Sequence, residues 1–68
     1  MVYVLEFLAT NPDGTRRTIE VLKQRAKTNS HIEEKAKTFM KEVFPHGRAD
    51  FCAIKDQMGQ VHSQVIGV

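Results

Sequence analysis

The side chains with the most reactive chemistry in this chain are a single cysteine and three histidines. If residues 49–56 and 61–68 pair as strands, Cys52 and His62 lie diagonally on one sheet face. A thiolate beside an imidazole is the minimum for a nucleophile and its base. No helix N-terminus lies behind Cys52, no third group is placed to orient His62, and a small cysteine in a strand usually serves packing. We therefore predict no catalytic residue and no enzymatic activity.

Metal binding would need the histidines to gather around a common point. Besides Cys52 and His62, the candidates are His31 and His46, but none of them form the closely spaced ligand pairs that are typical of zinc sites. His31 falls at the exposed start of a predicted helix, and His46 falls in a turn. We therefore predict surface histidines and no metal site.

Three glutamates near one helix are candidates for paired carboxylates in acid–base catalysis. Glu33 is explained by a helix cap and by Lys37 one turn later, and Glu34 and Glu42 lie about two turns apart among lysines. The four glycines stand alone, so no phosphate-cradling loop is present. We predict a solvated helix face and no cofactor.

Positive charge is concentrated in the middle of the chain. Residues 16–41 carry eight Lys or Arg against three Glu, a net charge of +5, whereas the rest carries two against five, a net charge of −3. Such residues could contact the phosphates of a nucleic acid or an acidic protein partner. The aromatic residues Tyr3, Phe7, Phe39 and Phe51 have core assignments, which leaves no stacking platform for bases. The candidate phosphate-contacting residues are Arg16, Arg17, Arg25, Lys27, Lys35, Lys37 and Lys41.

The length of the chain, 68 residues, predicts one domain, residues 1–68. A domain of this size buries only about 60% of its unfolded surface, and one cysteine excludes an internal disulfide. Small domains with a marginal core often gain stability from a partner, so we predict a homodimer.

The lone cysteine indicates a cytoplasmic location. The first residues lack the basic start of a signal peptide, and no apolar run approaches the roughly 20 residues that cross a membrane.

The elements that position these residues begin with a hairpin. Residues 2–10 are rich in β-forming residues, and Asn-Pro-Asp-Gly at residues 11–14 predicts a type I turn followed by a glycine bulge. A regular register after this turn fixes which side chains share a face. The face that we expect to meet the core carries Tyr3, Leu5, Phe7, Ile19 and Val21.

The opposite face of this hairpin is unusually apolar. The same register places Glu6 directly opposite Glu20, which is unfavourable unless Arg16 or a partner chain supplies a nearby cation. Several aliphatic residues on one solvent-facing side favour a covered surface, although scattered exposed aliphatic residues are also common. The candidate dimer face is formed by Val2, Val4, Leu8 and Leu22.

Residues 28–45 contain the one amphipathic helix that the sequence pattern predicts. Ser30 and Glu33 match a capping box, with Asn29 as the alternative cap. Pro45 should end the helix one or two residues earlier. Apolar residues at helical spacing predict a buried face formed by Ile32, Ala36, Phe39, Met40 and Val43.

A second hairpin follows the helix, because residues 49–68 predict two strands joined by a turn at Gly59. A three-residue loop ending at Gly59 groups Phe51 and Ala53 with the apolar residues of the last strand. A two-residue turn would instead group Cys52 and Ile54 with the apolar residues Val61 and Val65 of the last strand. The ease with which glycine adopts a positive φ favours the three-residue loop.

The predicted order is therefore ββαββ. This is an α+β fold in which two hairpins form a four-stranded, mainly antiparallel sheet with one helix packed on one face. The apolar first strand should be central, which gives the strand order 2-1-3-4, with 2-1-4-3 as the alternative. One helix leaves the second face of the sheet uncovered. We predict a non-enzymatic interaction or assembly module that is homodimeric through its sheet, with a small nucleic-acid-binding protein as the alternative.

Overall fold

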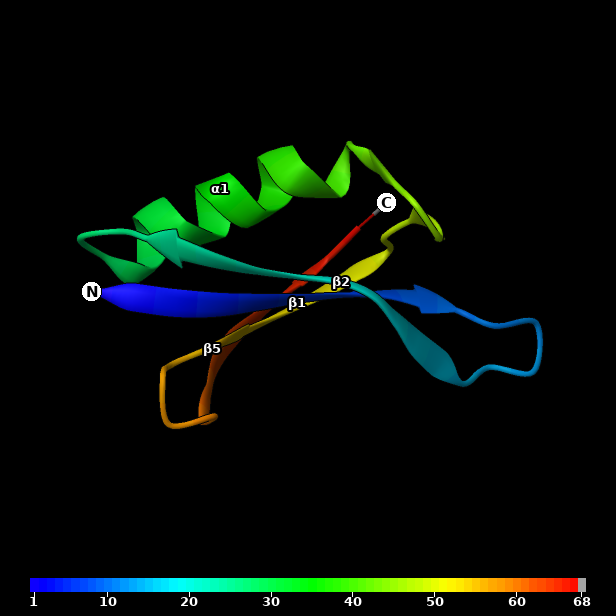
Figure 1. The fold of residues 1–68 in the computed structure, drawn as a ribbon, viewed down its shortest axis with the longest axis horizontal. Helices are drawn as coiled ribbons and strands as arrows, with labels where there is room; N and C mark the ends of the chain where they lie inside the picture. The colour runs from blue at the N-terminus through cyan, green and yellow to red at the C-terminus, as the bar shows by residue number, and fades with distance from the viewer. Residues whose placement is uncertain (68) are drawn as a thin grey trace.

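The computed structural model describes residues 1–67 and shows one helix lying across one face of a twisted sheet (Figure 1). Within these residues, four antiparallel strands form the sheet in the order β2-β1-β5-β6. The helix contacts β1, β5 and β6. The predicted α+β class and the strand order 2-1-3-4 are confirmed. The elements are β1 (Val2–Thr10), β2 (Arg16–Arg25), α1 (Asn29–Met40), β5 (Phe51–Lys55) and β6 (Val61–Ile66).

A small additional hairpin, which was not predicted, follows the helix and consists of β3 (Val43–Phe44) and β4 (Gly47–Arg48). The helix therefore ends at Met40, and the prediction that it reaches Val43 or Phe44 is wrong. The extended backbone turns the Phe44 ring onto Phe7, with 5.0 Å between ring centroids. It also leaves Val43 71% exposed, so Val43 does not belong to the buried helix face.

The start of the helix also differs from the predicted capping box. The N-cap is Thr28, whose Oγ1 accepts a hydrogen bond of 3.1 Å from the backbone N–H of His31. Ser30 and Asn29, the two predicted caps, lie inside the first turn. The Tyr3 hydroxyl donates to Asn29 Oδ1 at 2.8 Å, which ties this first turn to β1.

Both long hairpins close through the same kind of turn. In each, a three-residue loop ends in a glycine with positive φ, +91° at Gly14 and +86° at Gly59. The residue before each loop donates its N–H to the carbonyl of the residue after it, at 2.6 Å in the first hairpin and 2.9 Å in the second. These bonds confirm the predicted turn of the first hairpin and the three-residue loop of the second.

A bulge interrupts the pairing of β2 with β1. Between the pairs Leu8–Thr18 and Phe7–Glu20, Ile19 is an extra residue, and its side chain is buried in the core. The register therefore moves by one residue beyond the bulge. Leu22, rather than Val21, lies opposite Leu5, and the predicted pairing of Glu6 with Glu20 is wrong because Glu6 faces Val21.

A second bulge interrupts the pairing of β6 with β5, where His62 is the extra residue between the Lys55–Val61 and Ile54–Ser63 pairs. Beyond it, Val65 lies opposite Cys52 on the face that α1 covers, and Ile66 lies opposite Phe51 on the other face. The predicted grouping of Phe51 and Ala53 with Val65 is therefore wrong, although the loop that suggested it is present.

The core lies between α1 and the sheet face that carries alternate residues of β1. Those residues are Tyr3, Leu5, Phe7 and Ala9, and Ile54 of β5 and Val65 of β6 belong to the same cluster. The side chains of α1 that cover this cluster are Ile32, Ala36 and Met40. Within residues 1–67, no helix is long and apolar enough to span a membrane. The sheet thus has one covered face and one face that α1 does not reach.

Candidate functional site

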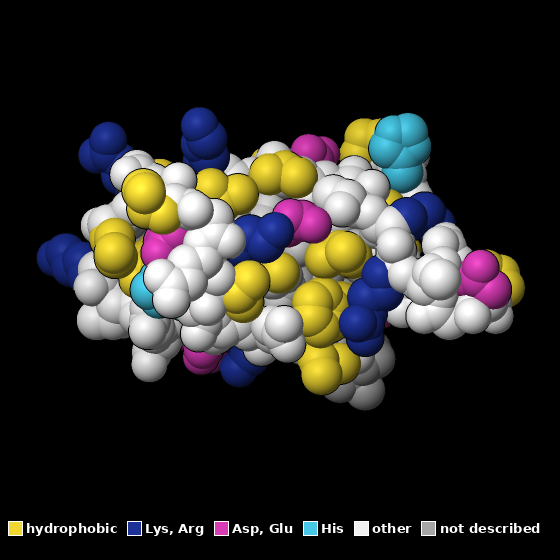
Figure 2. All heavy atoms as spheres, turned by 90° about the horizontal axis from the view of Figure 1, so that it is seen from below, with side chains coloured by type: hydrophobic (Ala, Val, Ile, Leu, Met, Phe, Trp, Pro, Cys, Tyr) yellow, Lys and Arg dark blue, Asp and Glu magenta, His cyan; other side chains and the backbone are white. Residues whose placement is uncertain are grey.

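The face of the sheet turned away from α1, which we call the helix-free face, is the main candidate site. Figure 2 views the molecule from the side opposite α1 and shows hydrophobic side chains spread across this face, interrupted by basic and acidic ones. Two of the apolar residues are well exposed, Val21 at 50% and Ile66 at 72%. By strand alternation and register, the apolar members are Val2, Val4, Leu8, Val21, Phe51, Ala53 and Ile66.

Three of the four predicted dimer residues lie on this face, because Val2, Val4 and Leu8 alternate with the core residues of β1. Leu22 does not, since the bulge at Ile19 turns it onto the core, and Val21 takes its place on the helix-free face. The sequence signal is that Ile19 and Leu22 are separated by an odd number of positions, so both can face the core only through a bulge such as the one at Ile19.

An ion pair lies near the centre of the helix-free face. Lys55 Nζ is 2.7 Å from Glu6 Oε2, and the Thr18 hydroxyl donates to Glu6 Oε1 at 3.2 Å. The hydrogen bond from Lys55 is the main cause that lowers the pKa of Glu6 below its ordinary value. The cation expected beside Glu6 is therefore Lys55, and Arg16 does not fill that role.

Among residues 1–67, Phe51 has the one aromatic ring on this face, and Arg16 covers it. The guanidinium carbon of Arg16 is 4.3 Å from the centroid of the Phe51 ring, which is a cation–π geometry. Phe51 is only 9% exposed although it lies on the helix-free side, and it is not part of the core beneath α1. Phe51 was predicted to pack in the core with Tyr3, Phe7 and Phe39; it is buried, but outside the cluster beneath α1. Because Arg16 lies over the ring, Phe51 does not offer an open surface on which a base could stack.

The fold separates the candidate phosphate-contacting residues into groups. Lys35 does reach the end of β2, where its ammonium group donates to the carbonyl oxygen of Arg25 at 2.7 Å, and Lys27 follows two residues later in the connection to α1. Arg17 lies at the other end of β2, where it donates to Asn11 Oδ1 at 2.6 Å. The positive charges of β2 are therefore separated along the length of the strand.

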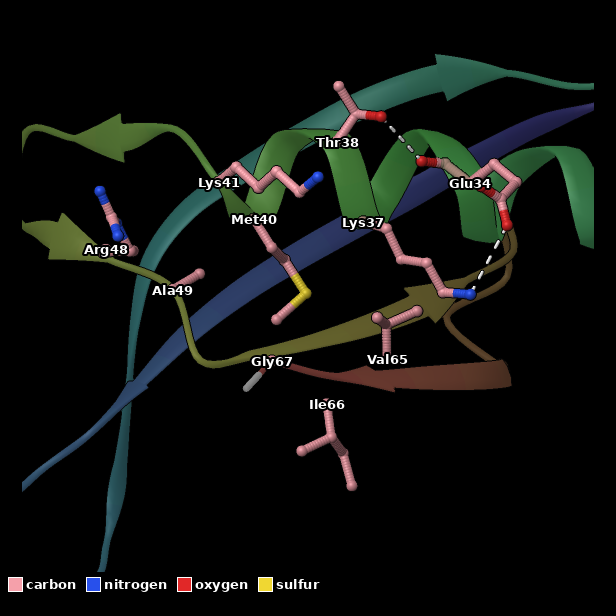
Figure 3. A pocket seen from close by; sticks show the side chains of 10 residues that line it. All are labelled: Glu34, Lys37, Thr38, Met40, Lys41, Arg48, Ala49, Val65, Ile66 and Gly67. Atoms are coloured by element: carbon pink, nitrogen blue, oxygen red, sulfur yellow. Dashed lines mark hydrogen bonds and ion pairs between the residues drawn. The ribbon is translucent and has the colours of Figure 1, made fainter.

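The remaining two lysines, Lys37 and Lys41, lie on the other flank of the helix. They line a pocket of about 500 Å³ beside β6, together with Arg48 of β4 (Figure 3). Lys37 also pairs with Glu34 at 3.5 Å. In Figure 3, Lys37 and Met40 reach from α1 toward β6. The floor of this pocket is apolar and includes Met40, Ala49 and Val65.

Cys52 and His62 are held in separate environments. Cys52 is fully buried beneath α1, and burial raises the pKa of its thiol to about 12, so the thiol stays protonated at neutral pH. His62 Nε2 lies 3.0 Å from Asp56 Oδ2, and its ring meets the Tyr3 ring edge-on at 6.0 Å between centroids. Cys52 is therefore held by packing in the core, and His62 is held by Asp56 and Tyr3.

The other two histidines are exposed, His31 in the first turn of α1 and His46 between β3 and β4. Among residues 1–67, no group of three or more His, Cys, Asp and Glu side chains is arranged to hold a metal ion.

Comparisons with protein-family models, with curated proteins and with solved structures find no match to this chain.

Proposed function

We propose that this protein is a non-enzymatic interaction module that forms a homodimer by stacking the helix-free faces of two sheets. The observation that carries this proposal is the set of exposed aliphatic side chains on that face, above all Val21 and Ile66, which are 50% and 72% exposed. Two antiparallel sheets stack face to face at about 10 Å with their strands nearly aligned. Burial of apolar area contributes roughly 25 cal/mol per Å², so stacking would add the stability that a small core lacks.

The charges of the helix-free face are compatible with a second copy as the occupant. At the centre, Glu6 is neutralised by Lys55 at 2.7 Å, so that pair enters the interface without net charge. Lys23 and Arg25 lie on β2 at the edge of the sheet, where long side chains can keep their charged ends in water. Repulsion between these rim charges weakens the dimer only modestly and is screened by salt.

A pair of matched variants tests this proposal. Val21→Lys places a charge on the helix-free face, whereas Val43→Lys makes the same change at a residue that is 71% exposed on the β3–β4 hairpin. In sedimentation equilibrium, we expect Val21→Lys to have a lower molar mass than the wild type, because the stacking contact is lost. Val43→Lys should keep the wild-type molar mass. Equal masses for the two folded variants would contradict the stacked dimer.

A cytoplasmic location, favoured by the single buried thiol of Cys52, is part of the same proposal.

A second candidate function, nucleic-acid binding, is favoured by one corner of the molecule. Arg25, Lys27 and Lys35 gather where β2 leads into α1, with the Lys35 ammonium 2.7 Å from the Arg25 carbonyl. Such a cluster can contact phosphates, and its affinity would fall as salt rises. The covered Phe51 ring and the separation of Lys37 and Lys41 from this corner make it the weaker candidate.

Retention on a heparin column distinguishes the two groups of lysines. If the corner binds phosphates, Lys27→Ala with Lys35→Ala elutes at lower salt than Lys37→Ala with Lys41→Ala, which removes the same charge from the opposite flank. Identical elution of the two double variants would show that retention reflects net charge alone and would remove the basis of this candidate.

A further inference from the structure

The two edges of the sheet are chemically different. The outer strand β2 carries four basic residues and one acidic residue, and such charges protect an edge from pairing with another strand. The other outer strand, β6, has the sequence Val-His-Ser-Gln-Val-Ile and contains no Lys, Arg, Asp or Glu. Within residues 1–67, β6 pairs only with β5, so its second side is a free edge without charged protection.

The backbone of β6 offers hydrogen bonds along this free edge. The N–H of Gly67 donates to the carbonyl of Asp50 at 2.8 Å, on the side of β5. Backbone groups alternate in direction along a strand, so Ser63 and Val65 also point toward β5, and Gln64 and Ile66 point outward. The outward N–H and C=O groups of Gln64 and Ile66 are placed to pair with an added strand.

The flank of α1 above this edge fits a second copy of the same chain. The helix contacts both β5 and β6, and strands in a sheet are about 4.8 Å apart. A two-fold pairing of β6 with its copy would therefore place the two helices roughly 10 Å apart, a normal packing distance. Glu34 and Lys37 on this flank form an ion pair at 3.5 Å and can exchange partners across the two-fold axis, whereas Lys41 and Arg48 line the same pocket and place like charges at its rim.

We propose that the β6 edge is a second docking surface and that its occupant is a second copy of this chain, paired antiparallel to form one continuous sheet of eight strands. The apolar floor of the neighbouring pocket, formed by Met40, Ala49 and Val65, gives the partner helix a surface to pack against (Figure 3). This pairing does not depend on the stacking of helix-free faces. With both contacts present, two such eight-stranded sheets stack into a tetramer with the helices outside.

The test uses Gln64, whose N–H points to the free edge. Proline lacks this N–H and is tolerated on an edge strand, so Gln64→Pro removes the pairing, whereas Gln64→Ala keeps the backbone donor. In a Val21→Lys background, which blocks the helix-free face, we expect Gln64→Ala to remain a dimer and Gln64→Pro to be a folded monomer with a molar mass about two-fold lower. Equal masses for the two folded double variants would overturn the pairing.

Hydrogen exchange of the unmodified protein gives a second measurement that does not require any variant to fold. Pairing predicts that the amides of Gln64 and Ile66 exchange more slowly as protein concentration rises. Fast exchange of both amides at every concentration would overturn the proposal and leave the edge open to a foreign strand. Failure of the stacked dimer has a different signature, because Val21→Lys would then leave the molar mass unchanged while Gln64→Pro still lowers it.

Discussion

Ile32 and Val43 show how strongly the position of the helix end decides the role of a single residue. Both fit the apolar face of the predicted helix, but Ile32 is fully buried and Val43 is 71% exposed. Ile32→Val should therefore lower the free energy of unfolding by about 0.5–1.5 kcal/mol. Val43→Ala, which removes more atoms, should change it by less than about 0.5 kcal/mol. Urea denaturation measures both, and a larger loss for Val43→Ala would contradict the observed helix end.

The Glu6–Lys55 pair predicts a specific dependence of stability on pH. The hydrogen bond from Lys55 lowers the pKa of Glu6 in the folded chain below its ordinary value of 4.5. The unfolded chain therefore takes up this proton at higher pH than the folded chain does. The stabilisation is fully present above pH 4.5 and is lost as pH falls through the lowered pKa.

Glu6→Gln isolates this contribution from those of the other carboxyl groups. The stability difference between the wild type and Glu6→Gln should be largest near neutral pH and shrink as the pH falls below 4.5, the ordinary pKa of the carboxyl group. Thermal unfolding followed by circular dichroism across this range measures the difference. A difference that stays constant or grows in acid would show that the pair does not lower the pKa of Glu6.

At the scale of single elements, the two hairpins depend on a glycine in the left-handed region. Gly59 has a φ of +86°, and a Cβ there would meet no atom within 4 Å, so the cost of a side chain is purely conformational. We expect Gly59→Ala to lower the free energy of unfolding by about 1–2 kcal/mol. Gly59→Asn should cost less, because asparagine adopts this conformation more readily. Equal losses for the two variants would contradict a backbone origin.

The elements also show which parts of the fold local sequence can predict. The turns at Gly14 and Gly59 follow from a few adjacent residues, and both were predicted. The strand order followed from the apolar pattern of β1, which is central and pairs on both sides. The bulges at Ile19 and His62 were not predicted, because strand alternation alone allows more than one register and contacts made in the folded chain select between them. Ile19 is held in the core, and His62 is held by Asp56 and Tyr3.

The same distinction applies to the candidate site. Val2, Val4 and Leu8 were placed correctly because β1 itself has no extra residue, whereas Leu22 lies beyond the bulge in β2 and faces the core. The early end of α1 has a similar origin. Phe44 lies in the short strand β3 with its ring against Phe7, and the sequence near Pro45 does not reveal that distant contact.

At the scale of the whole molecule, the charges around the helix-free face predict how assembly responds to salt. Arg16, Lys23 and Arg25 lie on this side of β2, so two stacked faces bring like charges near each other. Raising the salt concentration from about 0.05 to 0.5 M should therefore strengthen the stacked dimer. Nucleic-acid binding would weaken instead. The Gln64→Pro variant is the suitable sample, since its β6 edge is blocked, and a dimer that weakens with salt would contradict this arrangement of charges.

The central claim is self-association through the helix-free face, and sedimentation equilibrium at high micromolar concentration tests it most directly. The wild type, Val21→Lys and Val43→Lys are compared after circular dichroism has shown that each is folded. The stacked dimer predicts that the wild type and Val43→Lys share one molar mass and that Val21→Lys falls below it by one association step. A folded wild-type monomer, or one mass shared by all three proteins, would contradict the claim.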